Sequence, residues 1–210
     1  MDIYKLLENN IFLFDVDDTL LYTFENGFLK INAAAIAKGY EKISFEEYRN
    51  LYGTCSFEQC LMEWFPGCDV ETMTEAYARQ CKKYPYRPVC DFGSIQNRLL
   101  ERGINCGILT NGHNDRKLLQ KLRVAGADVP KLIGIWGKED IPFPKPDPRA
   151  LNPVRSRFPG SKIVYFGDSY ADHRMCADAG ISFVQVKTGK EDIIDQNDHL
   201  ATIKDILDYL

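Results

Sequence analysis

The chain has 210 residues, of which 45% are hydrophobic and 27% are charged, and its formal net charge is −4. This composition is typical of a globular protein, and the lack of a basic surplus argues against a nucleic-acid-binding surface. The N-terminus shows neither a signal peptide nor a membrane span, so we expect a cytoplasmic protein without a membrane partner. The seven cysteines match no standard zinc-site spacing, and we expect them to be reduced thiols.

The first predicted element is a buried strand at residues 11–14, an apolar run without charges or turn formers. Three carboxylates follow within four residues, at Asp15, Asp17 and Asp18. Carboxylates so close together repel one another and are costly to desolvate, and a hard cation such as Mg²⁺ would offset both effects. If Asp15 ends the strand, Asp15 and Asp17 point to the same side. An acidic turn on a solvated face is the alternative interpretation of this segment alone.

Residues 22–90 contain no strand-like apolar run, and they predict a block of amphipathic helices. Residues 32–38 are rich in alanine and stop before a glycine, which is a suitable C-terminal cap. Ser44 and Ser56 each open a segment typical of a capping box, and Asp69 is a suitable N-cap for a further helix. The aromatic residues of this block have helical spacing, and we expect them to form its core.

Helices and strands alternate regularly from residue 94 onward. The predicted strands cover residues 105–109, 132–136, 162–166 and 182–186, with a helix before each and a last amphipathic helix at residues 203–210. This alternation indicates an α/β fold with a parallel, doubly wound sheet and right-handed crossovers. We therefore expect residues 1–21 and 91–210 to form an α/β core domain, interrupted by a helical domain at residues 22–90.

Polar residues follow each predicted strand, where the carboxyl ends of a parallel sheet bind ligands. Thr110 and Asn111 offer a hydroxyl and backbone N–H groups to an anion, although an ordinary Asn-Gly turn explains them equally well. Lys145 stands among three prolines that fix the backbone, and a solvated lysine is its alternative. Asp168 and Asp172 add two carboxylates across a strand-to-helix turn, where capping of the helix by Asp168 or Ser169 is the other interpretation.

The order and placement of these residues together resemble the haloacid dehalogenase (HAD) superfamily over essentially the whole chain. The matching segments are motif I at Asp15-Val16-Asp17-Asp18-Thr19, motif II at Thr110, motif III at Lys145 and motif IV from Gly167-Asp168 to Asp172. The resemblance implies a HAD-like Rossmannoid core, and the insert after motif I resembles the helical C1 cap of subfamily I. The segment at residues 145–148 resembles the phosphoglycolate-phosphatase-like members of subfamily IA.

The resemblance also implies roles for the two motif I aspartates. Asp15 would attack phosphorus and form an aspartyl-phosphate, while Asp17 would protonate the leaving alcohol and later deprotonate the hydrolytic water. Mg²⁺ would bind the Asp15 carboxylate, the Asp17 backbone carbonyl and Asp168.

The remaining motif residues would serve the phosphoryl group. By resemblance, Thr110, the Asn111 amide and Lys145 would hold its oxygens, and Lys145 would also hold down the pKa of the nucleophile. Asp172 would orient Lys145 or a metal-bound water, and Thr19 would support the site. A closing cap would exclude water and select the leaving group.

The resemblance thus predicts a Mg²⁺-dependent phosphatase that acts on a small-molecule phosphate monoester, as a monomer or homodimer. Asp17 favours phosphoryl transfer over dehalogenation, and the lack of a lysine at residues 43–81 argues against Schiff-base chemistry. A sugar phosphomutase is disfavoured because no basic residue follows Gly53 closely. A non-catalytic phosphate-binding regulatory protein is a further alternative to the phosphatase. The family often has a small residue directly after the second aspartate of motif I. This chain has Asp18 there, as some nucleotidase-like members do.

Overall fold

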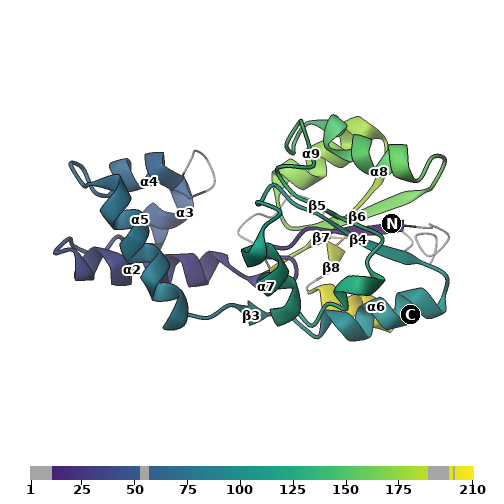
Figure 1. Cartoon of the computed structure of the whole chain (residues 1–210), viewed down its shortest axis with the longest axis horizontal. Coiled ribbons are helices and arrows are strands. Elements are labelled where there is room, and N and C mark those ends of the chain that lie inside the picture. Colours follow the sequence, from purple (N-terminus) through teal and green to yellow (C-terminus); the bar gives the residue numbers. More distant parts are fainter. Residues whose placement is uncertain (1–10, 53–56, 189–198, 201) are drawn as a thin grey trace. The chain divides into compact units, whose positions relative to one another are not determined.

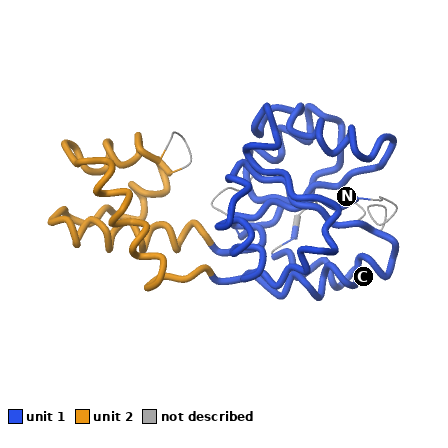
Figure 2. Tube along the Cα trace, in the orientation of Figure 1, with its two compact units in different colours: residues 1–22, 87–210 blue, residues 23–86 orange. Residues whose placement is uncertain are grey.

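The computed structural model describes residues 11–52, 57–188, 199–200 and 202–210. The expected capping box at Ser56 and the segment after Gly53 lie outside these residues. The chain divides into two compact units (Figure 2): residues 1–22 with 87–210 form unit 1, and residues 23–86 form unit 2. No helix among the described residues is long and apolar enough to cross a membrane.

Unit 1 is built on a six-stranded parallel sheet, as predicted. The strand order is β5-β4-β1-β6-β7-β8. The strands are β1 Ile11–Phe14, β4 Asn105–Leu109, β5 Ile135–Trp136, β6 Ile163–Gly167, β7 Ser182–Val186 and β8 His199–Leu200. All neighbouring strands in this sheet pair in parallel over the described residues. The two-residue strand β8 was not predicted, because two residues are too short to show a hydrophobic period.

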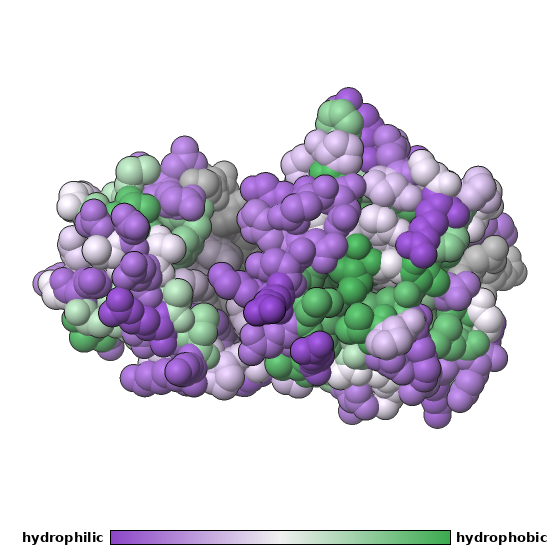
Figure 3. Space-filling view, viewed as in Figure 1, coloured by the Kyte–Doolittle hydropathy of each residue, from purple (hydrophilic) through white to green (hydrophobic). Residues whose placement is uncertain are grey.

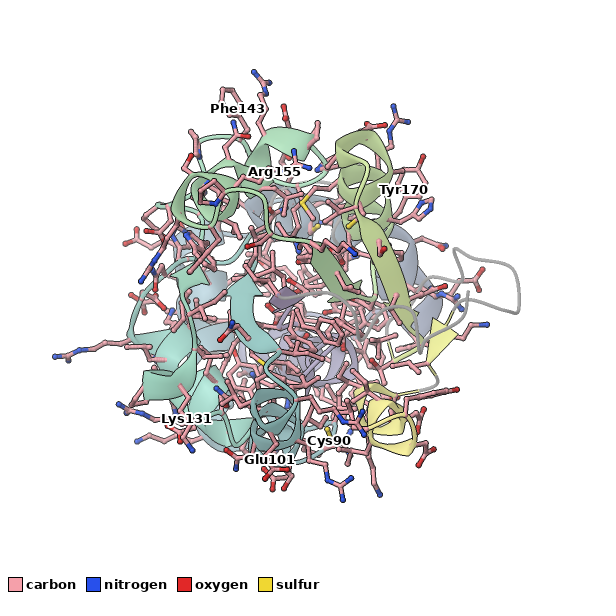
Figure 4. The ribbon with its side chains drawn as sticks, turned by 90° about the vertical axis from the view of Figure 1, so that its right-hand side faces the viewer. Cys90, Glu101, Lys131, Phe143, Arg155 and Tyr170 are labelled. Carbon is pink, nitrogen blue, oxygen red and sulfur yellow. The ribbon has the colours of Figure 1, made fainter. Side chains whose placement is uncertain are left out.

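Helices cover both faces of this sheet (Figure 1), as a doubly wound fold requires. Helices α6 (Phe92–Glu101) and α7 (Arg116–Val124) lie on one face. Helices α8 (Asn152–Arg157) and α9 (Tyr170–Ala179) lie on the other, and the 3₁₀ helix η3 (Pro148–Leu151) leads into α8. Figure 4 shows the same three layers from the end, with Phe143 and Tyr170 on the upper layer and Cys90 and Glu101 on the lower.

The central strand β1 is buried on both faces. Ile11 and Leu13 pack in the hydrophobic cluster on the side of α8 and α9. The alternate residues, Phe12 and Phe14, contact the ring of Phe166 at 5.0 and 4.9 Å between ring centroids. Because β1 is buried on both faces, all of its residues are apolar, and apolar residues do not alternate with polar ones.

Two predicted elements of unit 1 differ from the structure. Of the strand predicted at residues 132–136, only the last two residues form a regular strand, β5. Residue Ile133 nevertheless donates from its backbone N to Cys106 O at 2.9 Å. The predicted terminal helix is the 3₁₀ helix η4 (Ile203–Asp208), in which Tyr209 N donates to Ile206 O at 3.0 Å. Hydrogen bonds from residue i to i+3 make a 3₁₀ helix tighter than an α-helix, and this geometry is common in short helical segments.

Unit 2 is helical. It contains α2 (Phe24–Ala37), α3 (Phe45–Leu51), α4 (Phe57–Trp64), α5 (Val70–Arg79) and the 3₁₀ helix η1 (Gln80–Lys82). The capping box at Ser44 and the N-cap at Asp69 are both present, as predicted. Tyr48 lies in the core, with its ring stacked on Tyr52 at 4.8 Å and on Trp64 at 5.3 Å. The expectation that these aromatic residues form a core is therefore confirmed.

A short antiparallel ribbon marks the places where the chain leaves and re-enters unit 1. It consists of β2 (Leu21–Tyr22) and β3 (Arg87–Pro88). The predicted block of helices at residues 22–90 is therefore bounded by strand residues at Tyr22 and at Arg87–Pro88, which do not form helices. Strands of two residues carry no readable pattern, and Pro88 argues locally against a strand.

On the face that Figure 3 shows, both units carry hydrophilic and hydrophobic residues. Hydrophobic residues show amid hydrophilic ones on the face of unit 1 that is in view. The large hydrophobic side chains that the structure exposes are Leu29, Ile36, Phe45, Met62, Val124, Phe143 and Tyr170.

Candidate functional site

The loops after β1, β4, β5 and β6 bring the predicted site residues to the carboxyl end of the sheet. Asp15 directly follows β1, and its backbone N donates to Phe166 O at 2.9 Å, which extends the ladder by one residue. Asp15 therefore continues the face of Ile11 and Leu13, on the side of α8 and α9. It is 6% exposed.

Lys145 lies at the centre of a buried polar cluster. Its Nζ donates to Asp15 Oδ1 at 2.8 Å, to Asp172 Oδ1 at 2.5 Å and to Tyr165 Oη at 2.8 Å. The side chains of Lys145, Asp15 and Asp172 are 4%, 9% and 0% exposed. An ammonium group has three donors, so these three acceptors satisfy it completely. Burial alone would lower the pKa of Lys145, but the Asp15 and Asp172 carboxylates outweigh burial and raise it.

The Asn111 side chain holds the Lys145 backbone in place. Asn111 Oδ1 accepts from Lys145 N, and Asn111 Nδ2 donates to Lys145 O, both at 2.9 Å. This pair of hydrogen bonds ties the loop after β4 to the loop after β5. The sequence predicted a role for the Asn111 backbone amide, and the clamp formed by its side chain is an addition that the structure reveals.

Asp172 is fixed by the start of α9. Its Oδ2 accepts from Ser169 N at 3.1 Å and from Ser169 Oγ at 2.6 Å, which completes a capping box and leaves Oδ1 for Lys145. Gly167 makes this placement possible, because a Cβ at that position would lie 2.5 Å from Asp172 Oδ2. Ser169 is the N-cap of α9, so the capping interpretation of this turn is confirmed, and the role of Asp172 in the site stays a prediction.

Asp168 completes a group of three buried carboxylates. One oxygen from each of Asp15, Asp168 and Asp172 lies within 4.8 Å of the others. Burial raises the pKa of Asp15 to about 7, although Lys145 opposes this shift. Burial, reinforced by Asp15, also raises the pKa of Asp168 well above its usual value. Lys145 balances one of three carboxylates, so a divalent cation would neutralise the remaining charge, and the oxygen ligands suit such an ion.

Asp17 lies apart from this group, at the edge of the site. Its Oδ1 accepts from Lys121 Nζ at 2.5 Å, and its side chain is 40% exposed. Lys121 belongs to α7, so Asp17 is held from the layer of helices opposite to α8 and α9. Sequence reasoning did not find Lys121, because a lysine in an amphipathic helix carries no motif.

The remaining motif residues are buried at the same end of the sheet. Thr110 is 3% exposed, and its Oγ1 accepts from Gly112 N at 3.1 Å, as in a turn. Thr19 is fully buried, and its Oγ1 has no hydrogen-bond partner among the described residues.

Comparison with known proteins places the chain in a family. The family model described as haloacid dehalogenase-like hydrolase matches residues 12–186, which is most of the chain. The chain belongs to the haloacid dehalogenase-like hydrolase family. No curated protein matches the chain closely enough to add to this.

Solved structures of haloacid dehalogenase-like proteins share the fold. One is a subfamily IA HAD hydrolase from Geobacter sulfurreducens (20% identity, TM-score 0.71, covering 96% of each chain). Another, from Haemophilus somnus, is described as a predicted phosphoglycolate phosphatase (17% identity, TM-score 0.76, covering 96% of this chain and 98% of that one). A third is CbbY from Rhodobacter sphaeroides in complex with phosphate (18% identity, TM-score 0.69, covering 92% and 94%).

Family membership confirms the resemblance drawn from the motifs, and it makes the protein an enzyme of the hydrolase class. Asp18 adopts a left-handed backbone with φ of 55°. This conformation disfavours most side chains, but aspartate is among the residues that tolerate it.

Tyr165 is a site residue that sequence reasoning missed, because its position inside β6 predicted a core role only. Its hydroxyl accepts from Lys145 Nζ and donates to Leu109 O at 2.6 Å. We expect Tyr165→Phe to lower the free energy of unfolding by about 1–3 kcal/mol, since it leaves a buried donor and a buried acceptor unpaired. Urea denaturation measures this change.

The control for this prediction is Tyr170→Phe, at a tyrosine that is 55% exposed. Its unfolding free energy should stay within about 0.5 kcal/mol of the wild-type value. Equal stability of the Tyr165→Phe and wild-type proteins would contradict the bridging role of the hydroxyl.

Proposed function

We propose that this hydrolase is a Mg²⁺-dependent phosphatase that cleaves a small phosphate monoester through an aspartyl-phosphate intermediate. The observation that carries the proposal is the buried ion cluster of Lys145 with Asp15 and Asp172, beside Asp168. Enclosed carboxylates around one lysine are costly to maintain in a purely structural role. They suit a site that receives a metal ion and a phosphoryl group.

Two aspartates carry the covalent steps. An Asp15 oxygen forms a bond to phosphorus as the bond from phosphorus to the ester oxygen breaks, and Asp17 gives its proton to the departing alkoxide. Water then attacks phosphorus and loses a proton to Asp17, and the bond between phosphorus and Asp15 breaks. Inorganic phosphate leaves, and both aspartates return to their starting states.

The other residues bind and orient. The carboxylates of Asp15 and Asp168 and the Asp17 backbone carbonyl would hold the metal, and Asp172 orients Lys145. When bound, Mg²⁺ neutralises the carboxylates and polarises the phosphoryl oxygens. Thr110 and the Asn111 backbone amide hold those oxygens, Lys145 stabilises the negative charge that develops on them, and Thr19 supports the loop. The phosphate complex of CbbY, which shares the fold, agrees with a phosphate site.

The two units would have different roles in catalysis and in substrate selection. Unit 1 carries every residue assigned to the chemistry, whereas unit 2 offers no motif of its own and acts as a cap that selects the leaving group. The substrate class is therefore set by unit 2, while the reaction is set by unit 1.

The test is a screen of phosphate-ester metabolites with Mg²⁺, read by release of inorganic phosphate. Hydrolysis of one or several small monoesters is the expected result. Phosphate that moves between the hydroxyls of one sugar without release would identify a mutase. Binding of Mg²⁺ and phosphate without any turnover across the panel would identify a regulatory protein, and either outcome overturns the proposal.

Metal binding should also be visible in stability. We expect Mg²⁺ at one hundred times its dissociation constant to stabilise the fold by about 2.7 kcal/mol, because only the folded state assembles the site. Thermal unfolding with and without Mg²⁺ measures the gain. Asp168→Asn should remove most of it, whereas the control Asp178→Asn, an exposed aspartate paired with Arg174, should keep it. The same gain in both variants would contradict the assignment of Asp168.

A further inference from the structure

Lys121 contacts the aspartate to which the proposed function assigns both proton transfers. Its Nζ donates to Asp17 Oδ1 at 2.5 Å, and its side chain is 18% exposed. Lys121 lies three residues after the buried Leu118 of α7, which places it next to the buried face of the helix. The charged end thus reaches Asp17 from a well-anchored position.

The two aspartates are held by different layers of the fold. Asp15 is bound by Lys145 on the side of α8 and α9, and Asp17 is bound by Lys121 of α7 on the other side. Asp17 needs such an anchor, because its negative charge repels the buried carboxylates and contributes to raising the pKa of Asp15. Among the described residues, Lys121 is the sole side chain that bonds the Asp17 carboxylate.

We propose that Lys121 is a positioning residue for Asp17, an inference that rests on the proposed function. It binds Oδ1 and offsets the repulsion from the acidic cluster, so that Oδ2 serves the leaving oxygen and the hydrolytic water. Lys121 itself transfers no proton and forms no bond with the substrate. Its contribution therefore depends on how strongly the leaving group needs the proton that Asp17 supplies.

Two aryl phosphates of similar shape separate this role from a structural one. Phenolate is a more basic leaving group than 4-nitrophenolate, and phenyl phosphate therefore depends more on protonation. We expect Lys121→Met to lower kcat/KM for phenyl phosphate at least about tenfold and for 4-nitrophenyl phosphate less than about threefold. Lys121→Arg, which keeps the cation, should recover most of the loss. The control is Lys117→Met, an exposed lysine of the same helix, which should match the wild type.

A double variant sharpens the test. Because Lys121 acts through Asp17, Asp17→Asn/Lys121→Met should be no slower on phenyl phosphate than Asp17→Asn alone. Additive losses, equal losses on both substrates, or rates like those of Lys117→Met would each overturn the inference. Thermal unfolding checks that the variants fold, and Lys121→Gln replaces Lys121→Met if the latter does not.

Failure of this inference is distinguishable from failure of the proposed function. If the wild type hydrolyses both aryl phosphates and Asp15→Asn is inactive, while Lys121→Met is unimpaired, only the role of Lys121 is wrong. If the wild type hydrolyses no phosphate ester, the proposed function and this inference are both wrong.

Discussion

Asp15→Asn is expected to reduce phosphatase activity by at least about 10⁴-fold, because an amide oxygen is a poor nucleophile and forms no aspartyl-phosphate. Release of 4-nitrophenolate from 4-nitrophenyl phosphate in the presence of Mg²⁺ measures the loss. Mass spectrometry of acid-quenched enzyme should detect an added phosphoryl group on wild-type Asp15 during turnover and none on the variant.

This variant should fold. Its amide still accepts a hydrogen bond from Lys145, and one of the mutually repelling charges in the buried cluster is removed. Asp147→Asn is the matched control, since Asp147 lies outside the cluster and pairs with Arg149. Activity of Asp15→Asn comparable to that of the control would end the assignment of Asp15 as nucleophile.

Lys145→Met is expected to damage stability as well as activity. It leaves the buried carboxylates of Asp15 and Asp172 without their cation, and loss of one partner of a buried pair costs about 3–5 kcal/mol. Urea unfolding without Mg²⁺ measures the loss, and phosphate release should fall by at least about 10³-fold.

A second substitution separates these two effects. Lys145→Met/Asp172→Asn removes one of the stranded charges, so it should recover part of the lost stability while remaining inactive. The control Lys117→Met removes an exposed lysine and should change neither property. A Lys145→Met protein as stable as the wild type in the absence of Mg²⁺ would contradict the buried ion cluster.

The sequence predicted the parallel sheet and the family because both depend on local patterns. The apolar run of β1 is long enough to show burial on both faces, and the motif residues follow the strands at which they are used. Capping residues such as Ser44 and Asp69 were readable because a cap acts within three residues of its own position.

The site residues that were not predicted make contacts with residues far away in the sequence. Lys121 meets Asp17 across 104 residues, and Tyr165 reaches Leu109 across 56. No local period marks either contact, since one lysine in an amphipathic helix and one tyrosine in a buried strand are ordinary. The pairing of Asn111 with the Lys145 backbone likewise depends on two neighbouring strands, β4 and β5, which bring their loops together.

The position of β1 in the chain has a consequence for biosynthesis. Ile11 of β1 pairs with Asn105 of β4 and with Ile163 of β6, so β1 is synthesised long before either of its neighbours in the sheet. Contacts so distant in sequence slow folding, and a waiting apolar segment is prone to aggregate. The ribosome completes residues 23–86 before either partner strand exists, so β1 has neither of its sheet neighbours throughout that interval.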